Sequence, residues 1–140
     1  MDGMRATQTD LWVVAQTCWG EARNQQSIGM YAVAWVIRNR HDFHRRWKGM
    51  PLADICRYPF QFSCWNIKDK NLPKMRDVSL DDRVFCQCLL AAVEVMGGLV
   101  MSSVGRSTHY YVAESRMPNW AKGQAPLCQV GAHLFFENIK

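Results

Sequence analysis

The stretch that decides the fold is residues 10–40, DLWVVAQTCWGEARNQQSIGMYAVAWVIRNR. It predicts two helices joined by a short polar turn. In the first helix, capped by Thr9 or Asp10, the apolar residues recur at the spacing of one helical face. That stripe consists of Leu11, Val14, Ala15, Cys18, Trp19 and Ala22. The second helix has Ser27 as its predicted N-cap and is apolar on nearly every side, so we expect it to be the central helix of the core.

Glu21 is an acidic residue in the first helix that a purely structural role does not explain. At about 100° per residue it falls at the border of the apolar stripe, and no Lys or Arg lies one turn away to pair with it. A carboxyl group beside an aromatic-rich face and without a local cation is one that can hold its proton near neutral pH. Glu21 is therefore a candidate general acid, although most glutamates on amphipathic helices are solvated surface residues.

The middle third predicts one more long helix and little other regular structure. Pro51–Cys56 fits a short helical turn, whereas residues 57–77 are aromatic-rich and irregular, with Pro59 and Pro73 breaking any regular element. Residues 79–96 open with a capping-box-like pattern and continue as an apolar stripe, which predicts a third helix.

The last third of the sequence lacks helical patterns and contains short segments typical of strands. Residues 107–113 and 130–136 are short, aromatic and β-branched, which predicts strands or extended loops. No repeat, low-complexity tract or linker interrupts residues 1–140, so we expect one domain. The predicted fold class is mainly α (α+β), with a small β-hairpin or extended segments in the C-terminal third.

Composition limits the class of protein. Hydrophobic residues make up 49% and charged residues 21% of the 140, which excludes wholesale disorder. The longest apolar run, Met30–Ile37, is too short to cross a bilayer, so no stable membrane association is expected. The first ten residues lack the apolar core of a secretory signal, which predicts accumulation in the cytoplasm. The net charge of +5 favours polyanionic partners such as nucleic acid, anionic lipid or an anionic wall polymer.

Two sets of residues are candidate binding sites, one for a saccharide and one for nucleic acid. The first combines Glu21 with aromatic and amide side chains, which suit saccharide binding because amides bond ring hydroxyls and flat rings cover a pyranose face. Its members are Gln61, Phe62, Trp65, Tyr110, Tyr111 and Trp120. The second is a nucleic-acid-binding module on Arg38–Lys48, where seven of eleven residues are Arg, Lys or His and the aromatics Phe43 and Trp47 would stack on bases.

Two further candidates depend on cysteine and histidine. A nucleophile pair would join Cys64 or Cys18 to His109 or His133, but no spacing marks an activated thiolate. A metal site would combine cysteines with His41, His44, His109 and His133. Neither a Cys-x-x-Cys nor a His-Glu-x-x-His pattern supports it, so no metal or cofactor is expected.

Five ordered motifs resemble the SleB-type cell-wall hydrolase family, best known for spore-cortex-lytic enzymes. They are WGEAR (19–23), GMYAVAWVIRNR (29–40), FQFSCW (60–65), STHYYVAESRMPNW (107–120) and VGAHLFF (130–136). The resemblance implies a lysozyme-like domain, related to goose-type lysozymes and resuscitation-promoting factors. It also implies cleavage of the β-1,4 bond between N-acetylmuramic acid and N-acetylglucosamine in peptidoglycan.

Carried over by motif, the resemblance makes Glu21 the catalytic acid. The substrate-binding residues that we predict around it are Gln61, Phe62, Ser63, Trp65, Thr108, His109, Tyr110, Tyr111 and Trp120. The family usually continues its Glu-Ala-Arg motif with Gly-Glu, whereas this chain has Asn24 and Gln25, so a second acid is missing there. We therefore expect a lytic transglycosylase with a single acid, and a hydrolytic muramidase on the same bond is the alternative.

The resemblance also sets the expected partners. The substrate is bacterial peptidoglycan, and no nucleic acid is expected as a ligand. Without an export signal or a separate wall-binding domain, the chain fits a monomeric lysin of the phage endolysin type. Such a lysin accumulates in the cytoplasm and depends on a holin-type partner for its release to the cell wall.

Overall fold

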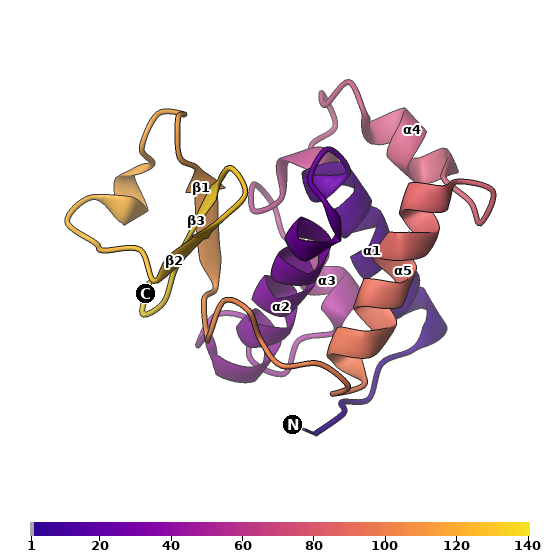
Figure 1. Ribbon diagram of the computed structural model, residues 1–140, viewed down its shortest axis with the longest axis horizontal. Coiled ribbons are helices and arrows are strands. Elements are labelled where there is room, and N and C mark those ends of the chain that lie inside the picture. Colours follow the sequence, from indigo (N-terminus) through magenta and orange to yellow (C-terminus); the bar gives the residue numbers. More distant parts are fainter. Residues whose placement is uncertain (1) are drawn as a thin grey trace.

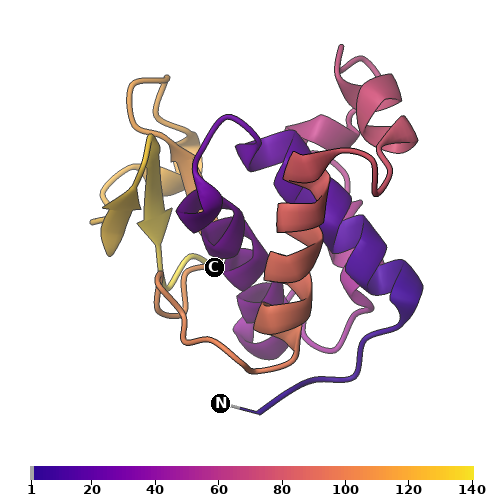
Figure 2. The ribbon, with the colours of Figure 1, turned by 45° about the vertical axis from the view of Figure 1, so that its right-hand side comes forward.

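Three long helices form the core: α1 (Gln8–Ala22), α2 (Ser27–Phe43) and α5 (Arg83–Met96). They pack against one another in the computed structural model, which describes residues 2–140. In both views of the ribbon, the small sheet lies beside α2 on the side away from α5 (Figures 1 and 2). Every residue from position 32 to position 40 of α2 is buried, which confirms that α2 is the central helix.

The helices begin at other residues than predicted, because different side chains cap them. Thr7 caps α1 in a capping box: its hydroxyl accepts from the backbone N–H of Asp10, and the Asp10 carboxylate accepts from the backbone N–H of Thr7. Neither predicted residue is therefore the cap itself. Ser27 is the first residue of α2, and the residue before it makes no capping bond through its side chain. Helix α5 begins at Arg83 rather than at residue 79, and Asp82 caps it by accepting from the backbone N–H of Phe85.

Three short helical elements connect α2 to α5. The predicted helical turn is confirmed as α3 (Leu52–Cys56). The prediction of irregular structure over residues 57–77 is wrong in part, because the 3₁₀ helix η1 (Ser63–Trp65) and the helix α4 (Leu72–Asp77) form there. Pro73 lies in the first turn of α4, where its missing N–H has no intrahelical partner to lose. All three elements pack against α1.

The C-terminal third forms a three-stranded antiparallel sheet in the order β1-β3-β2. The predicted extended segments are confirmed as β1 (His109–Val112) and β3 (His133–Phe136), whereas the intervening strand β2 (Cys128–Val130) was not predicted. A short 3₁₀ helix, η2 (Asn119–Ala121), lies in the connection from β1 to β2. The predicted fold class, mainly helical with a small sheet at the C-terminal end, is confirmed.

No helix within residues 2–140 combines the length and the apolar character needed to cross a lipid bilayer.

Candidate active site in a groove around Glu21

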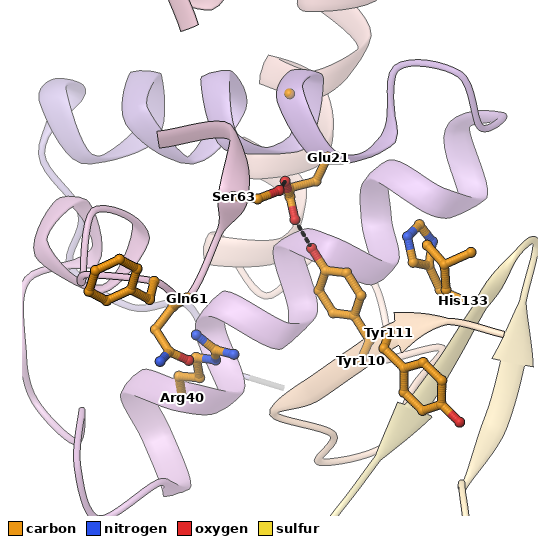
Figure 3. A pocket seen from close by; sticks show the side chains of 10 residues that line it. Glu21, Arg40, Gln61, Ser63, Tyr110, Tyr111 and His133 are labelled. Carbon is orange, nitrogen blue, oxygen red and sulfur yellow. Dashed lines mark hydrogen bonds between the residues drawn. The ribbon is translucent and has the colours of Figure 1, made fainter. Parts of the chain in front are cut away.

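Glu21, near the C-terminal end of α1, lies in a hollow of about 390 Å³ between that helix, the segment before η1, and the sheet (Figure 3). The side chains around the hollow come from five separate parts of the chain. They are Gly20, Glu21, Arg40, Phe60, Gln61, Ser63, Tyr110, Tyr111, Val112 and His133. Strand β1 and η1 thus bring aromatic and polar groups to a carboxyl group on a helix.

Two smaller hollows extend this one into a groove, because each shares walls with it. One, of about 310 Å³, also contacts Glu21 and is lined by the amides of Asn24, Gln25 and Asn71. We call it the amide end. The other, of about 260 Å³, shares four residues with the central hollow, and its lining residues are Arg40, Arg46, Phe60, Gln61, His109, Tyr110, Trp120, Ile139 and Lys140. We call it the basic end. Among residues 2–140, Glu21 is the one Asp or Glu whose side chain lines the groove.

The carboxylate of Glu21 accepts a short hydrogen bond from Tyr110. The Tyr110 hydroxyl donates to Oε1 of Glu21 over 2.6 Å, the interaction drawn as a dashed line in Figure 3. Burial and the nearby Glu21 charge raise the pKa of Tyr110 well above its usual value, so its hydroxyl stays protonated and remains a donor. The backbone N–H of Cys64 and the Ser63 hydroxyl lie farther away, at 3.4 and 3.5 Å from Oε2.

Gly20 allows η1 to approach α1 closely enough for these contacts. A Cβ at position 20 would lie 2.6 Å from Cβ of Cys64 and 2.8 Å from Sδ of Met75, closer than such atoms pack in folded proteins. Any side chain at position 20 would therefore push η1, and with it the donors of Ser63 and Cys64, away from Glu21. Gly20 was not predicted as a site residue, because the clash lies between segments far apart in the chain.

Arg40 is a second groove residue that was not predicted. Its side chain is buried in the wall, where the guanidinium lies 4.3 Å from the ring centre of Trp47 and 4.7 Å from that of Phe62. Its Nε donates to the backbone oxygen of Thr108 over 2.7 Å. Burial lowers the pKa of Arg40 to about 10, so the group still carries its charge at neutral pH. In the sequence nothing distinguishes Arg40 from its basic neighbours.

Phe60 was also missed, although it lines both the central hollow and the basic end. Its side chain is 89% exposed, and its backbone has a φ of 64°, in the left-handed region that a bulky side chain rarely adopts. An aromatic ring presented to solvent beside a groove is a surface on which a sugar ring can stack.

Of the predicted substrate-binding residues, those that line the groove are Gln61, Ser63, His109, Tyr110, Tyr111 and Trp120. The other three lie elsewhere. Phe62 is 1% exposed and packs in the core beneath Arg40. The Thr108 side chain is buried, with its hydroxyl 2.9 Å from Nδ1 of His109. Trp65 donates through its indole to the Thr17 hydroxyl and lines a separate hollow. None of these three residues lines the groove.

The two groove histidines are neutral at physiological pH. Burial and the charge of Arg40 lower the pKa of His109 to about 3, and its ring packs 5.0 Å from that of Trp120. Burial likewise lowers the pKa of His133, whose ring lies 5.0 Å from that of Tyr110. Both histidines therefore act as walls of the groove rather than as proton donors.

The cysteine and metal hypotheses do not fit the structure. Burial raises the pKa of Cys64, and the Glu21 charge raises it further, so Cys64 stays a thiol. Cys18 is fully buried, and its thiol donates to a backbone oxygen rather than to a histidine. In residues 2–140, no three His, Cys, Asp or Glu side chains are placed to hold a metal ion together.

The basic segment Arg38–Lys48 does not form one exposed surface, contrary to the nucleic-acid hypothesis. Arg38 is buried and donates to the backbone oxygen of Val95 and to the Asp42 carboxylate. Trp47 is 0% exposed, so it has no free face on which a base could stack. The segment therefore contributes to the core and to the groove wall.

Comparisons with known proteins identify the family and the fold. Residues 24–136 match the family model described as Cell Wall Hydrolase. The catalytic domain of the Bacillus cereus SleB protein superposes with a TM-score of 0.76 at 18% sequence identity, covering 97% of this chain and 95% of that chain. The catalytic domain of the germination-specific lytic transglycosylase SleB from Bacillus anthracis gives 0.70 at 18% identity, covering 94% and 96%.

No curated protein sequence matches. The family match nevertheless spans most of the chain, and the superpositions show that the fold is that of SleB catalytic domains. The predicted resemblance is therefore confirmed: the chain belongs to the Cell Wall Hydrolase family.

Proposed function

We propose that the protein cuts the β-1,4 bond between N-acetylmuramic acid and N-acetylglucosamine in peptidoglycan, as a lytic transglycosylase with Glu21 as acid and base. The observation that carries the proposal is a lone carboxyl group in the middle of a groove, held by the Tyr110 hydroxyl at 2.6 Å. Membership of the Cell Wall Hydrolase family supports the substrate, and one structural relative is described as a lytic transglycosylase.

The reaction needs only one carboxyl group. Protonated Glu21 gives its proton to the glycosidic oxygen as the bond to the muramoyl C1 breaks, and the positive charge that develops at C1 resembles an oxocarbenium ion. The Glu21 carboxylate then takes the proton of the muramoyl C6 hydroxyl, whose oxygen bonds to C1. The products are a free 4-hydroxyl on the leaving sugar and a 1,6-anhydromuramoyl end, and Glu21 recovers its proton.

The groove supports this use of Glu21 in two ways. Tyr110 stabilises the carboxylate that exists between the two proton transfers, since a charged acceptor strengthens a hydrogen bond. Aromatic and amide groups from the exposed Phe60 and the partly buried Gln61 and Trp120 lie along the groove, where they can stack on sugar rings or bond their hydroxyls.

A hydrolytic muramidase is the competing mechanism, and the absence of a second acid in the groove argues against it. Glycosidases that use two carboxylates place them roughly 5–5.5 or 6.5–9.5 Å apart. Among the described residues, the groove lining contains no Asp or Glu besides Glu21, so no side chain is available to activate a water opposite the acid.

Mass spectrometry of the products distinguishes the two mechanisms. Digestion of purified peptidoglycan is expected to yield fragments that end in 1,6-anhydromuramic acid, which are lighter by one water than the reducing ends that a muramidase leaves. Reducing ends alone would assign the hydrolytic mechanism. No soluble fragments at all, from a folded preparation, would contradict the proposed function itself.

Replacement of Tyr110 by Phe is expected to lower kcat by about 10- to 100-fold with little change in KM, which corresponds to the loss of one hydrogen bond to a charged group. The matched control is Tyr31→Phe, which removes a similar bond of 2.7 Å to Glu94, outside the groove. Initial rates of fragment release measure both variants. Equal rates for the two would show that Tyr110 does not support the acid.

The proposal includes the biological setting predicted from the sequence. We propose a phage-type endolysin that reaches the wall through a holin-type partner. The net charge of +5 supports it, because a basic protein adheres to anionic wall polymers.

A further inference from the structure

The basic end of the groove collects positive charge without any acidic side chain to balance it. Its cationic residues are Arg40 in the wall and, at the rim, the exposed Arg46 and Lys140. No Asp or Glu of the described chain lines it. The hollow joins the one that contains Glu21 through Arg40, Gln61 and other shared residues, so a ligand here belongs to the strand that Glu21 would cut.

Arg40 has no salt-bridge partner among the described residues, although the charge of Glu21 favours its charged form. The salt bridges of residues 2–140 involve Arg38 and His41 with Asp42, and neither Arg40 nor Arg46 has a carboxylate oxygen within 4.0 Å. The Nη1 group of Arg40 is buried and makes no hydrogen bond. A buried guanidinium without a salt bridge and without a full set of acceptors is costly, unless a ligand supplies them. Figure 3 shows Arg40 and Gln61 among the side chains that line the hollow around Glu21.

The neighbouring groups suit a sugar acid more than a free anion. Trp120 lines the same hollow, and His109, which packs against Trp120, is uncharged. An aromatic ring beside cationic side chains can contact the apolar face of a pyranose while the cations bind a carboxylate attached to it. Neutral sugar hydroxyls alone would not require three positive charges.

We infer that the basic end of the groove binds a carboxylate carried by the glycan strand, so that the enzyme prefers peptidoglycan with free carboxyl groups. The inference rests on the proposed function. Peptidoglycan carries two kinds of carboxylate near its sugar backbone: the lactyl carboxylate of a muramic acid without its peptide, and the carboxylates of the stem peptide. A guanidinium fork matches either of them in geometry.

The test compares two adjacent arginines. Arg46→Gln removes a charge that lines the basic end, whereas Arg45→Gln removes an equal charge from the neighbouring exposed residue, which does not line the groove. Both variants lower the net charge by one, so general adhesion to the wall falls equally. On peptidoglycan freed of teichoic acid, Arg46→Gln is expected to raise KM about fivefold or more with kcat nearly unchanged, because a charge-assisted hydrogen bond is lost. Arg45→Gln is expected to match the parent protein.

The substrate is varied in the same assay. Capping the carboxyl groups of the peptidoglycan with a neutral amide is expected to raise the KM of the parent protein and to abolish its difference from Arg46→Gln. Glycan stripped of stem peptides keeps the difference if the lactyl carboxylate is the ligand and loses it if the peptide carboxylate is. Equal KM values for the two arginine variants, or equal cleavage of capped and uncapped substrate, would overturn the inference while the proposed function stands. Failure of the parent protein to cut any of these substrates would overturn the proposed function, and this inference with it.

Discussion

Glu21→Gln is expected to reduce the rate of peptidoglycan cleavage by about a thousandfold, because general acid catalysis contributes roughly 10²- to 10⁴-fold in enzymes. Glutamine keeps the size of the side chain, and its carbonyl oxygen can still accept the hydrogen bond from the Tyr110 hydroxyl. What it cannot do is donate an acidic proton to the leaving oxygen. The groove has no other Asp or Glu among the described residues to replace it, and the nearby His133 is neutral.

The measurement is the initial rate of soluble fragment release, together with the free energy of unfolding in urea. Because Glu21 is half-buried at the end of α1 and forms no salt bridge, the free energy of unfolding is expected to change by less than about 1 kcal/mol. Glu94→Gln is the matched control, since Glu94 also accepts a tyrosine hydroxyl but lies outside the groove. A Glu21→Gln protein that keeps more than a tenth of the parent rate would exclude Glu21 as the acid.

Trp47→Ala is expected to have the largest effect on stability, lowering the free energy of unfolding by about 3–5 kcal/mol. Trp47 is 0% exposed, and its ring packs 4.4 Å from that of His44 and 5.7 Å from that of Tyr58. The guanidinium of Arg40 lies 4.3 Å from its ring centre, so the cavity left by the substitution would also loosen the groove wall.

Urea unfolding measures this effect, and Trp47→Phe provides a milder variant that is expected to fold and to lose about half as much. Phe43→Ala is the control from the same segment: this ring is 45% exposed, so we expect a change of about 1 kcal/mol or less. The nucleic-acid hypothesis makes the opposite prediction. If Trp47 stacked on bases, Trp47→Ala would weaken retention on DNA and leave the stability unchanged.

The elements that the sequence predicted well are those with a local physical cause. The sequences of α1 and α2 are rich in apolar residues because residues 13–19 of α1 and residues 32–40 of α2 are buried, and this pattern is visible within 15 residues. The strands β1 and β3 are rich in aromatic residues. Helix starts were predicted less well, since several residues near each start can serve as a cap and packing selects among them.

The candidate acid was recognisable because its signal is also local. Glu21 sits at the edge of an apolar stripe with no cation one helical turn away, and a motif of five residues surrounds it. The positions of the side chains around it could not all be predicted from the sequence. Phe62 and Trp65 flank Ser63 and Cys64 in the same aromatic segment, yet η1 turns one into the core and the other toward a separate hollow.

The sequence by itself determined that the protein is a helical cell-wall hydrolase relative with an acidic residue on its first long helix. The tertiary structure alone decided what surrounds that residue. Tyr110 reaches Glu21 across 89 positions of sequence because β1 pairs with β3, and Arg40 turns away from its basic neighbours into the groove wall because α2 is buried at that point. Helical periodicity records which face of one element is buried, whereas a groove forms between elements, and its charges and donors depend on how those elements pack.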